Sequence, residues 1–297
     1  MRSVHILVVN GRKVRQPVFV LGAPHSGAEL IAGAIKRSAG FHLTMGQSSV
    51  RRVVYAFARR PSISQGRGDA VAAVLRDAFA QAWQVSPHAC LSCSPACRRA
   101  GGVEGVGPCV AERTIARYGD ATPNLLYCAS VLIDAFPDAR LVQVIRDGRD
   151  AVAGMLADSE ILATFRPSFA NVDSEFPHPF FGVETTTDQE RWPELSLAGK
   201  CALRWRSAVR VSARLRNTLS PEQLTTLRYE EVLARPNDAA GAVSAFVGAA
   251  ISATGLYDYD ARRGVEPGGW RHALSVEQAS EVENIAGDEL RRVGYGS

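Results

Sequence analysis

The chain has 297 residues, of which 46% are hydrophobic and 22% charged, and its formal net charge is +4. An intrinsically disordered chain is excluded, because the apolar content is near the globular average and the net charge is small. The longest apolar runs are too short to cross a membrane, and the first 16 residues contain no apolar signal segment. We therefore expect a cytoplasmic protein without a membrane span.

Apolar strands alternate with helical patterns along most of the chain. Residues 5–10 and 17–23 have strand patterns, and residues 24–40 follow with helical spacing. Further on, the sequence predicts helices over 69–84, 123–137, 148–158, 200–217, 237–250 and 275–292, a strand over 139–147, and a strand that runs into a turn over 223–233. This alternation predicts an α/β fold in which helices flank a central parallel sheet. We expect a single domain over residues 1–297.

Two segments lack a regular pattern. Residues 86–109 are rich in Cys, Gly and Pro and are expected to form a loop. Residues 159–199 are rich in Phe, Pro, Asp and Glu, and we interpret them either as a lid over an acceptor or as a surface excursion. The Phe residues of this segment would line an apolar pocket in the first case and anchor a long loop in the second.

The segment 22–29, Gly-Ala-Pro-His-Ser-Gly-Ala-Glu, lies between an apolar strand and a helix. Such a loop directs backbone N–H groups toward one point at a helix N-terminus, which favours an anion. The glycine spacing matches a P-loop, but Ala28 and Glu29 occupy the positions where a P-loop kinase needs Lys and a hydroxyl. A tight turn without a ligand is the alternative.

A second anion site is predicted at the end of the strand in ARLVQVIRDGRDAVAGM (139–155). Arg146 follows that strand directly, and the carboxyl ends of parallel strands are where α/β sheets bind ligands. Its guanidinium fork suits a phosphate. Arg149 and Asp150 could form only an ion pair at the start of the next helix. Arginine is scattered elsewhere, which does not favour a nucleic-acid-binding face.

These two elements, in this order, resemble the family of sulfotransferases that use 3′-phosphoadenosine 5′-phosphosulfate (PAPS). PHSGAE (24–29) is similar to the family's loop for the 5′-phosphosulfate, and IRDGRDAVAGM (145–155) to its strand and helix for the 3′-phosphate. LRYEEVLARP (227–236) resembles the segment whose Tyr lies near the adenine. RRGVEPGGWR (262–271) resembles the C-terminal phosphate loop, with one residue more.

The resemblance implies a P-loop-like sulfotransferase fold that transfers a sulfuryl group from PAPS to a hydroxyl of a small metabolite or sugar. It implies that the donor is bound by Pro24, His25, Ser26, Gly27, Ala28, Glu29, Arg146, Gly154, Tyr229, Arg262, Arg263 and Gly264. His25 would contact the leaving oxygen. No metal is needed for this chemistry.

The chain departs from the family pattern in the donor loop and after it. His25 replaces a Lys or Arg, Ala28 and Glu29 replace two hydroxyl residues, and Gly154 replaces a Ser at the 3′-phosphate. A neutral His stabilises developing negative charge less than a cation does. The alternative function is therefore a protein of this fold that has altered or lost PAPS binding and acts as a binding or scaffold protein.

Two residues are candidates for the base that deprotonates the acceptor hydroxyl. The family's Glu position falls near Gln47, which cannot take a proton, so we consider His42 and Asp120 instead. Asp120 belongs to GDATPN, which resembles a family segment that lines the acceptor site. The alternatives are a surface His and a helix-capping Asp.

Four of the six cysteines lie within twenty residues, at Cys90, Cys93, Cys97 and Cys109. Without an export signal, this cluster indicates metal binding or reduced thiols rather than disulfides. Thiolates at such short spacing form tetrahedral zinc sites, which hold together segments without a core of their own. Zinc and free thiols both stay open. Cys128 and Cys201 fall on apolar helices and are expected in the core.

Overall fold

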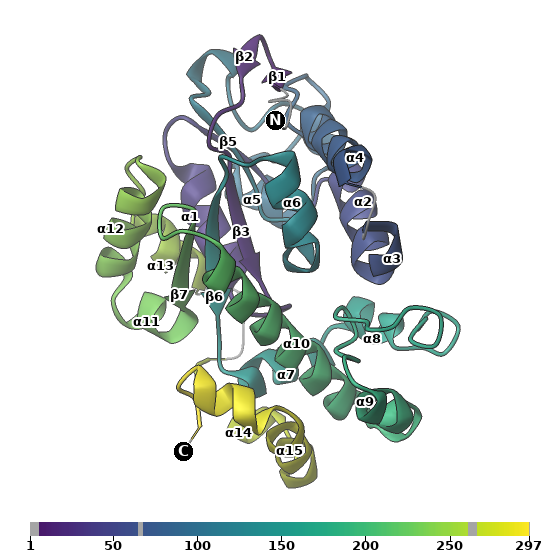
Figure 1. Ribbon diagram of the computed structural model, residues 1–297. Coiled ribbons are helices and arrows are strands. Elements are labelled where there is room, and N and C mark those ends of the chain that lie inside the picture. The colour runs from purple at the N-terminus through teal and green to yellow at the C-terminus, as the bar shows by residue number, and fades with distance from the viewer. Residues whose placement is uncertain (1–5, 65–67, 261–265, 297) are drawn as a thin grey trace.

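The computed structural model describes residues 6–64, 68–260 and 266–296. At its centre lies a five-stranded parallel sheet in the order β4-β5-β3-β6-β7 (Figure 1). Its strands are β3 (Val18–Gly22), β4 (Phe41–Thr44), β5 (Arg117–Asp120), β6 (Arg140–Ile145) and β7 (Leu224–Arg228). The N-terminal strands β1 (Val8–Val9) and β2 (Arg12–Lys13) form a separate antiparallel hairpin. The predicted fold class, a parallel sheet flanked by helices, is confirmed.

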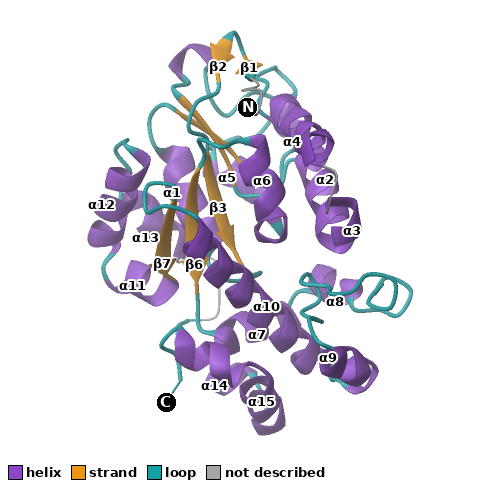
Figure 2. Ribbon diagram, viewed as in Figure 1, coloured by secondary structure: helices purple, strands orange, loops and turns teal. Residues whose placement is uncertain are grey.

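Side-chain alternation along β3 builds a core on each face of the sheet. Val18 and Val20 belong to one buried cluster, and Phe19 and Leu21 to the other, because successive residues of a strand point to opposite faces. The first cluster is covered by α1 (Ala28–Arg37), α5 (Pro95–Ala100), α11 (Tyr229–Ala234), α12 (Pro236–Val247) and α13 (Thr254–Asp260). Figure 2 shows helices on both sides of the strands.

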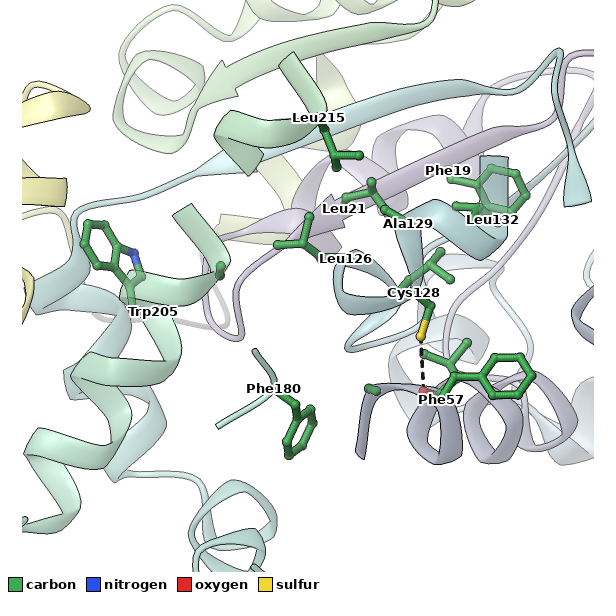
Figure 3. Packing of buried hydrophobic residues seen from close by; sticks show 14 of the residues in the cluster. Phe19, Leu21, Phe57, Leu126, Cys128, Ala129, Leu132, Phe180, Trp205 and Leu215 are labelled. Atoms are coloured by element: carbon green, nitrogen blue, oxygen red, sulfur yellow. Dashed lines mark hydrogen bonds between the residues drawn. The ribbon is translucent and has the colours of Figure 1, made fainter. Parts of the chain in front are cut away.

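The second cluster is larger and contains the long helix α10 (Leu197–Thr218). It also contains α2 (Ser48–Arg59), α4 (Gly68–Ala82), α6 (Ala129–Ala135), α7 (Gly148–Leu156) and α15 (Val276–Arg292). Figure 3 shows Phe19 and Leu21 packed with Leu132 and Leu215, and the Cys128 thiol beside the backbone of α2. The core positions predicted for Cys128 and Cys201 are confirmed, since both are buried. No helix in the described part of the chain is long and apolar enough to span a membrane.

The strands do not all reach the same height at their carboxyl ends. Asp120 at the end of β5 is level with Phe19 of β3 and with Thr44 at the end of β4. Strand β3 continues for three more residues, to Gly22, and β6 extends beside it. Strands β4 and β5 therefore end about 10 Å lower than β3.

Several sequence-based boundaries differ from the structure. Strands β4 and β5 were not predicted, because each has only four residues and carries polar side chains that become buried through distant contacts. The segment 86–109, expected to be loop, contains a 3-10 turn (Ala89–Ser92) and α5. The segment 159–199 contains α8 (Ser159–Thr164) and α9 (Thr186–Arg191). Residues 255–274, for which no helix was predicted, include most of α13 and the short α14 (Trp270–Ala273). A short helix that was not predicted, α3 (Pro61–Ser64), follows α2.

Candidate active site

The loop between β3 and α1 presents the N-terminus of α1 without a side-chain cap. Gly27 occupies the N-cap position with φ of 88°, and no side chain accepts the first N–H groups of the ten-residue helix. His25 also has a positive φ, of 59°. Uncapped N–H groups at a helix N-terminus are suited to an anion. Pro24, Ala28 and Glu29 are half-buried around them, as the prediction of a phosphate loop requires.

Two glycines in this loop are needed because other groups occupy their side-chain space. A Cβ on Gly22 would lie 2.1 Å from the hydroxyl of Ser26, which is buried and has no hydrogen-bond partner in the described part of the chain. A Cβ on Gly27 would lie 2.1 Å from the ring of Tyr229. The loop is therefore packed directly against Tyr229, at the start of α11.

Arg146 joins the two predicted anion sites. It follows β6, it is buried, and its Nη1 donates to the carbonyl oxygen of His25 at 3.3 Å. Its guanidinium also stacks on the ring of Tyr229, with Cζ 4.4 Å from the ring centroid. The indole of Trp205 donates to the backbone oxygen of Arg146 at 3.2 Å. The structure thus brings together the 22–29 loop, Arg146 and Tyr229. The sequence alone indicated only their order along the chain.

Tyr229 is packed differently from the expectation of an adenine contact. Its ring is 4% exposed and lies between Gly27 and Arg146. In this arrangement the Tyr229 ring packs against both candidate anion-binding elements, the loop at Gly27 and the guanidinium of Arg146. The adenine contact stays a prediction.

The two departures at positions 25 and 154 are one structural feature. Gly154 lies in α7, and a Cβ on it would lie 2.8 Å from Cγ of His25 and 2.9 Å from its Nδ1. The imidazole therefore occupies the space that the side chain of a Ser at position 154 would need. Nε2 of His25 is 3.1 Å from Oδ2 of Asp158, the residue that caps α8.

Asp150 connects α7 to the C-terminal loop, a role that sequence reasoning missed. Its two carboxylate oxygens accept the backbone N–H groups of Gly268 and Trp270, at 2.8 and 2.9 Å. Burial raises the pKa of Asp150, and these two hydrogen bonds together with nearby Arg146 act in the opposite direction. Arg262, Arg263 and Gly264 lie outside the described residues. Asp150 nevertheless fixes the chain that follows them directly beside Arg146.

The suggested Arg149–Asp150 ion pair is wrong. Arg149 instead binds Asp147 at 2.8 Å and Glu283 at 3.0 Å, and its guanidinium stacks on Trp270. Asp147 precedes α7 and caps it through the N–H of Arg149. Arg149 thus holds the start of α7 against α15 and α14, and it leaves Asp150 available to the C-terminal loop.

The two candidate bases lie on neighbouring strands, and both are buried. His42 is in β4, where burial, reinforced by nearby Lys36, lowers its pKa to about 4. Asp120 ends β5 and accepts hydrogen bonds from the hydroxyl of Thr44 at 2.5 Å and the N–H of Thr122 at 2.6 Å. Burial raises the pKa of Asp120 to about 7. The two alternatives considered, a surface His and a helix-capping Asp, are both wrong.

The aromatic residues of segment 159–199 divide into two groups. Phe165, Phe180 and Phe181 are buried and anchor the segment to the core: Phe165 and Phe181 pack against Trp192, and Phe180 packs against Phe181. Phe169 and Phe176 are about half exposed. Arg204 of α10 is also buried; its guanidinium stacks on Phe180 and donates to the side-chain oxygen of Asn124 at 2.7 Å. Most of these rings therefore serve as anchors of the segment.

Three comparisons relate this site to known proteins. Among curated proteins, no relative matches the chain. Solved structures that are similar to the chain include sulfotransferase STF9 from Mycobacterium avium, with 14% identity, 96% of this chain and 79% of that chain covered, and a TM-score of 0.48. Mouse sulfotransferase SULT7A1 complexed with PAP matches with 12% identity, covers 97% of this chain and 88% of its own, and has a TM-score of 0.45.

The sulfotransferase domain of the olefin synthase from Synechococcus PCC 7002 is similar at 13% identity, with 91% and 94% of the two chains covered and a TM-score of 0.46. The sequence profile described as the sulfotransferase family matches residues 17–253, which include the loop after β3, Arg146, Gly154 and Tyr229. This match covers most of the 297 residues. The chain belongs to the sulfotransferase family.

Proposed function

We propose that this protein transfers a sulfuryl group from PAPS to a hydroxyl of a small metabolite or carbohydrate. The observation that carries the proposal is the contact of Arg146 with the loop at His25, across one shared ring, Tyr229. A donor with a 5′-phosphosulfate and a 3′-phosphate needs two adjacent anion sites. The uncapped N-terminus of α1 and the guanidinium of Arg146 supply them side by side.

In this proposal the loop at 24–29 binds the 5′-phosphosulfate, and Arg146 binds the 3′-phosphate together with the loop at 262–264. The Asp150 hydrogen bonds to Gly268 and Trp270 support the second assignment, because they hold residues 268–270, which follow that loop, on α7, the helix that begins two residues after Arg146. His25 takes part through its imidazole, which fills the position of the missing side chain at residue 154. His25 would thereby lie beside a donor phosphate, at the place of the family's cation and serine.

Sulfuryl transfer also requires a proton to leave the acceptor hydroxyl. Of the two candidates we propose Asp120, because a base works best when its pKa lies near the working pH. Its pKa of about 7 meets this condition, and the value of about 4 for His42 does not. As Asp120 is fully buried, this role requires the acceptor hydroxyl to reach the carboxyl ends of β4 and β5.

Calorimetry with 3′-phosphoadenosine 5′-phosphate (PAP) tests the proposed donor site. We expect PAP to bind wild type and Arg140→Ala, and Arg146→Ala to lose binding while its melting temperature shows that it is folded. Arg140 is the matched control because it is the same residue type at the opposite end of β6. Wild type that does not bind at millimolar PAP would refute the donor assignment and favour the scaffold alternative.

Two further measurements separate the other functions. Magnesium-dependent binding of ATP without binding of PAP would identify a kinase instead, although Ala28 and Glu29 argue against it. A screen of hydroxylated metabolites and sugars with labelled PAPS then identifies the acceptor. A chain that binds PAP tightly but transfers label to none of them would retain the donor site without the proposed activity.

A further inference from the structure

The four clustered cysteines of segment 86–109 come together in space, although Cys109 is twelve residues beyond Cys97. The side chains of Cys93 and Cys109 lie near that of Cys90, and Cys93 also lies near Cys97. Cys90 and Cys97 are buried, whereas Cys93 and Cys109 are partly accessible. All six cysteines of the chain are present as free thiols. The sulfuryl transfer proposed above uses none of them.

Three of the four sulfurs also accept a hydrogen bond from an N–H group. The backbone N–H of Cys109 donates to Cys90, and that of Met45 donates to Cys97. Nζ of Lys36 donates to Sγ of Cys109 at 3.1 Å. N–H donors around sulfur favour the thiolate, which is the form that binds metals. Second-shell donors of this kind orient and tune metal ligands.

Lys36 supplies a buried positive charge to the cluster. It is 8% exposed, and its ammonium donates to the carbonyl oxygen of Leu43 and to Cys109. A buried charge is stable only when an opposite charge or a full set of hydrogen bonds accompanies it. Within the described part of the chain, no carboxylate forms an ion pair with Lys36. Its hydrogen bond to Cys109 places this cation directly at the sulfur cluster.

The backbone around the cluster leaves room for this arrangement only because residue 101 is a glycine. A Cβ on Gly101 would lie 2.8 Å from Cβ of Cys109 and 2.9 Å from Cε of Lys36. Gly101 thus allows the end of α5, the last turn of α1 and the bend at Cys109 to meet. Cys90-x2-Cys93-x3-Cys97 also has the short ligand spacing of structural zinc sites.

We propose that Cys90, Cys93, Cys97 and Cys109 bind one structural zinc ion. Binding would release the thiol protons to solvent and give a four-thiolate zinc centre of charge −2, of which Lys36 neutralises one unit. Among the described residues, no three His, Cys, Asp or Glu side chains already surround a point that could hold a metal ion. Zn–S bonds of about 2.3 Å separate tetrahedral sulfurs by about 3.8 Å, so the four side chains would have to close around the ion as it binds.

The ion would hold segment 86–109 over the ends of β4 and β5. The hydroxyl of Ser94 donates to the carbonyl oxygen of Met45 at 2.6 Å, and the Gln47 amide donates to Ser92 at 3.1 Å. A Cβ on Gly46 would contact both Ser94 and Pro123. The segment therefore packs directly on the residues that follow both strands. The zinc would fix this side of the site and would take no part in sulfuryl transfer.

Metal analysis of the full-length chain tests the proposal independently of any activity. We expect about one zinc per chain after gel filtration, and loss of zinc from Cys93→Ser and Cys109→Ser, whose side chains are the more accessible ones. The matched controls are Cys128→Ala and Cys201→Ala, which alter buried core thiols and should retain full zinc. Cobalt substitution should give the intense ligand-field bands of four-coordinate, sulfur-ligated cobalt in wild type and in both controls.

Lys36→Met distinguishes a metal site from a merely packed thiol cluster. Removing its N–H donor to Cys109 should weaken zinc binding about 10- to 100-fold in competition with a chromophoric chelator, as loss of an outer-shell partner does elsewhere. Two results would overturn the proposal. One is zinc well below one equivalent in wild type purified from zinc-supplemented cells. The other is an intact mass lower by the four hydrogens that two disulfides release. Neither result bears on PAP binding, so the proposed function is tested separately.

Discussion

Replacing Gly154 by serine restores the residue type of the family pattern, yet we expect it to damage this chain. The new Cβ would lie 2.8 to 2.9 Å from Cγ, Cβ and Nδ1 of His25, where carbon contacts of 3.5 to 4.0 Å are normal. Since Cβ of His25 is one of these atoms, rotating the ring does not relieve the contact. The loop must shift by more than about half an ångström, and the hydrogen bond from His25 to Asp158 breaks.

The expected loss of stability follows from these two effects. Overpacking costs about 1–3 kcal/mol, and loss of a hydrogen bond between side chains that are one-third exposed adds up to about 1 kcal/mol. Urea unfolding should therefore show Gly154→Ser less stable than wild type by about 1–3 kcal/mol. Gly241→Ser is the matched control, because Gly241 also lies in a helix but nothing is within 4 Å of its Cβ position. It should gain a few tenths of a kcal/mol from helix propensity.

A double-mutant cycle with His25→Ala tests whether the two positions depend on each other. Alanine removes the ring from the crowded space, so Gly154→Ser should cost at least about 1 kcal/mol less in the His25→Ala background. PAP affinity, measured in parallel, should fall in Gly154→Ser and partly recover in the double variant. Effects that add within about 0.5 kcal/mol would refute the coupling. So would a Gly154→Ser variant that binds PAP more tightly than wild type.

Three other predictions concern single residues. Burial raises the pKa of Asp120 from 3.8 to about 7, so between these pH values the folded chain keeps a proton that the unfolded chain releases. The free energy of unfolding should therefore fall by up to about 4 kcal/mol between pH 4 and 7. Urea titrations of Asp120→Asn should not show this fall with pH. Asp150→Ala leaves the N–H groups of Gly268 and Trp270 without their acceptor, so calorimetry should show PAP affinity at least about tenfold weaker, with exposed Asp238→Asn unchanged. Gly27→Ala places a Cβ against the Tyr229 ring at a positive φ, whereas Gly248→Ala has a positive φ without a close contact. Urea denaturation should show a loss of unfolding free energy of several kcal/mol for Gly27→Ala and of about 1–2 kcal/mol for Gly248→Ala. Equal losses would contradict the contact with Tyr229.

The sheet could be predicted wherever its strands are continuous apolar runs. Strands β3 and β6 have this pattern, and their positions were expected to within a few residues. Strand β7 begins where it was expected, but it ends at Arg228 and α11 follows directly. Strands β4 and β5 do not, because their buried polar groups are satisfied by residues far away in sequence. Asp120 relies on Thr44, 76 positions earlier, and the hydroxyl of Tyr118 donates to the backbone of Val9. No local pattern predicts such pairs.

The anion-binding elements were predictable because each one is a local motif at the end of a strand. The contacts between these motifs could not be predicted from the sequence. The exclusion of a side chain at Gly154 by His25 joins positions 129 residues apart, and Asp150 acts on backbone groups more than 110 residues later. From the sequence, His25 and Gly154 were two separate departures from the family pattern. In the structure the His25 imidazole occupies the space of a side chain at position 154, so the two departures are one coupled change.

The unequal strand ends give the cysteine segment its structural purpose. Because β4 and β5 end about 10 Å below β3, the sheet cannot form the wall of the site on that side. Segment 86–109 covers these ends, yet it contributes only short helical turns and a small number of buried apolar side chains, which provide little stability of their own. The proposed four-cysteine zinc centre would supply the missing stability, as such centres do in other small segments without a core. On the opposite side, where β3 and β6 extend further, the two hydrogen bonds of Asp150 hold Gly268 and Trp270 against α7.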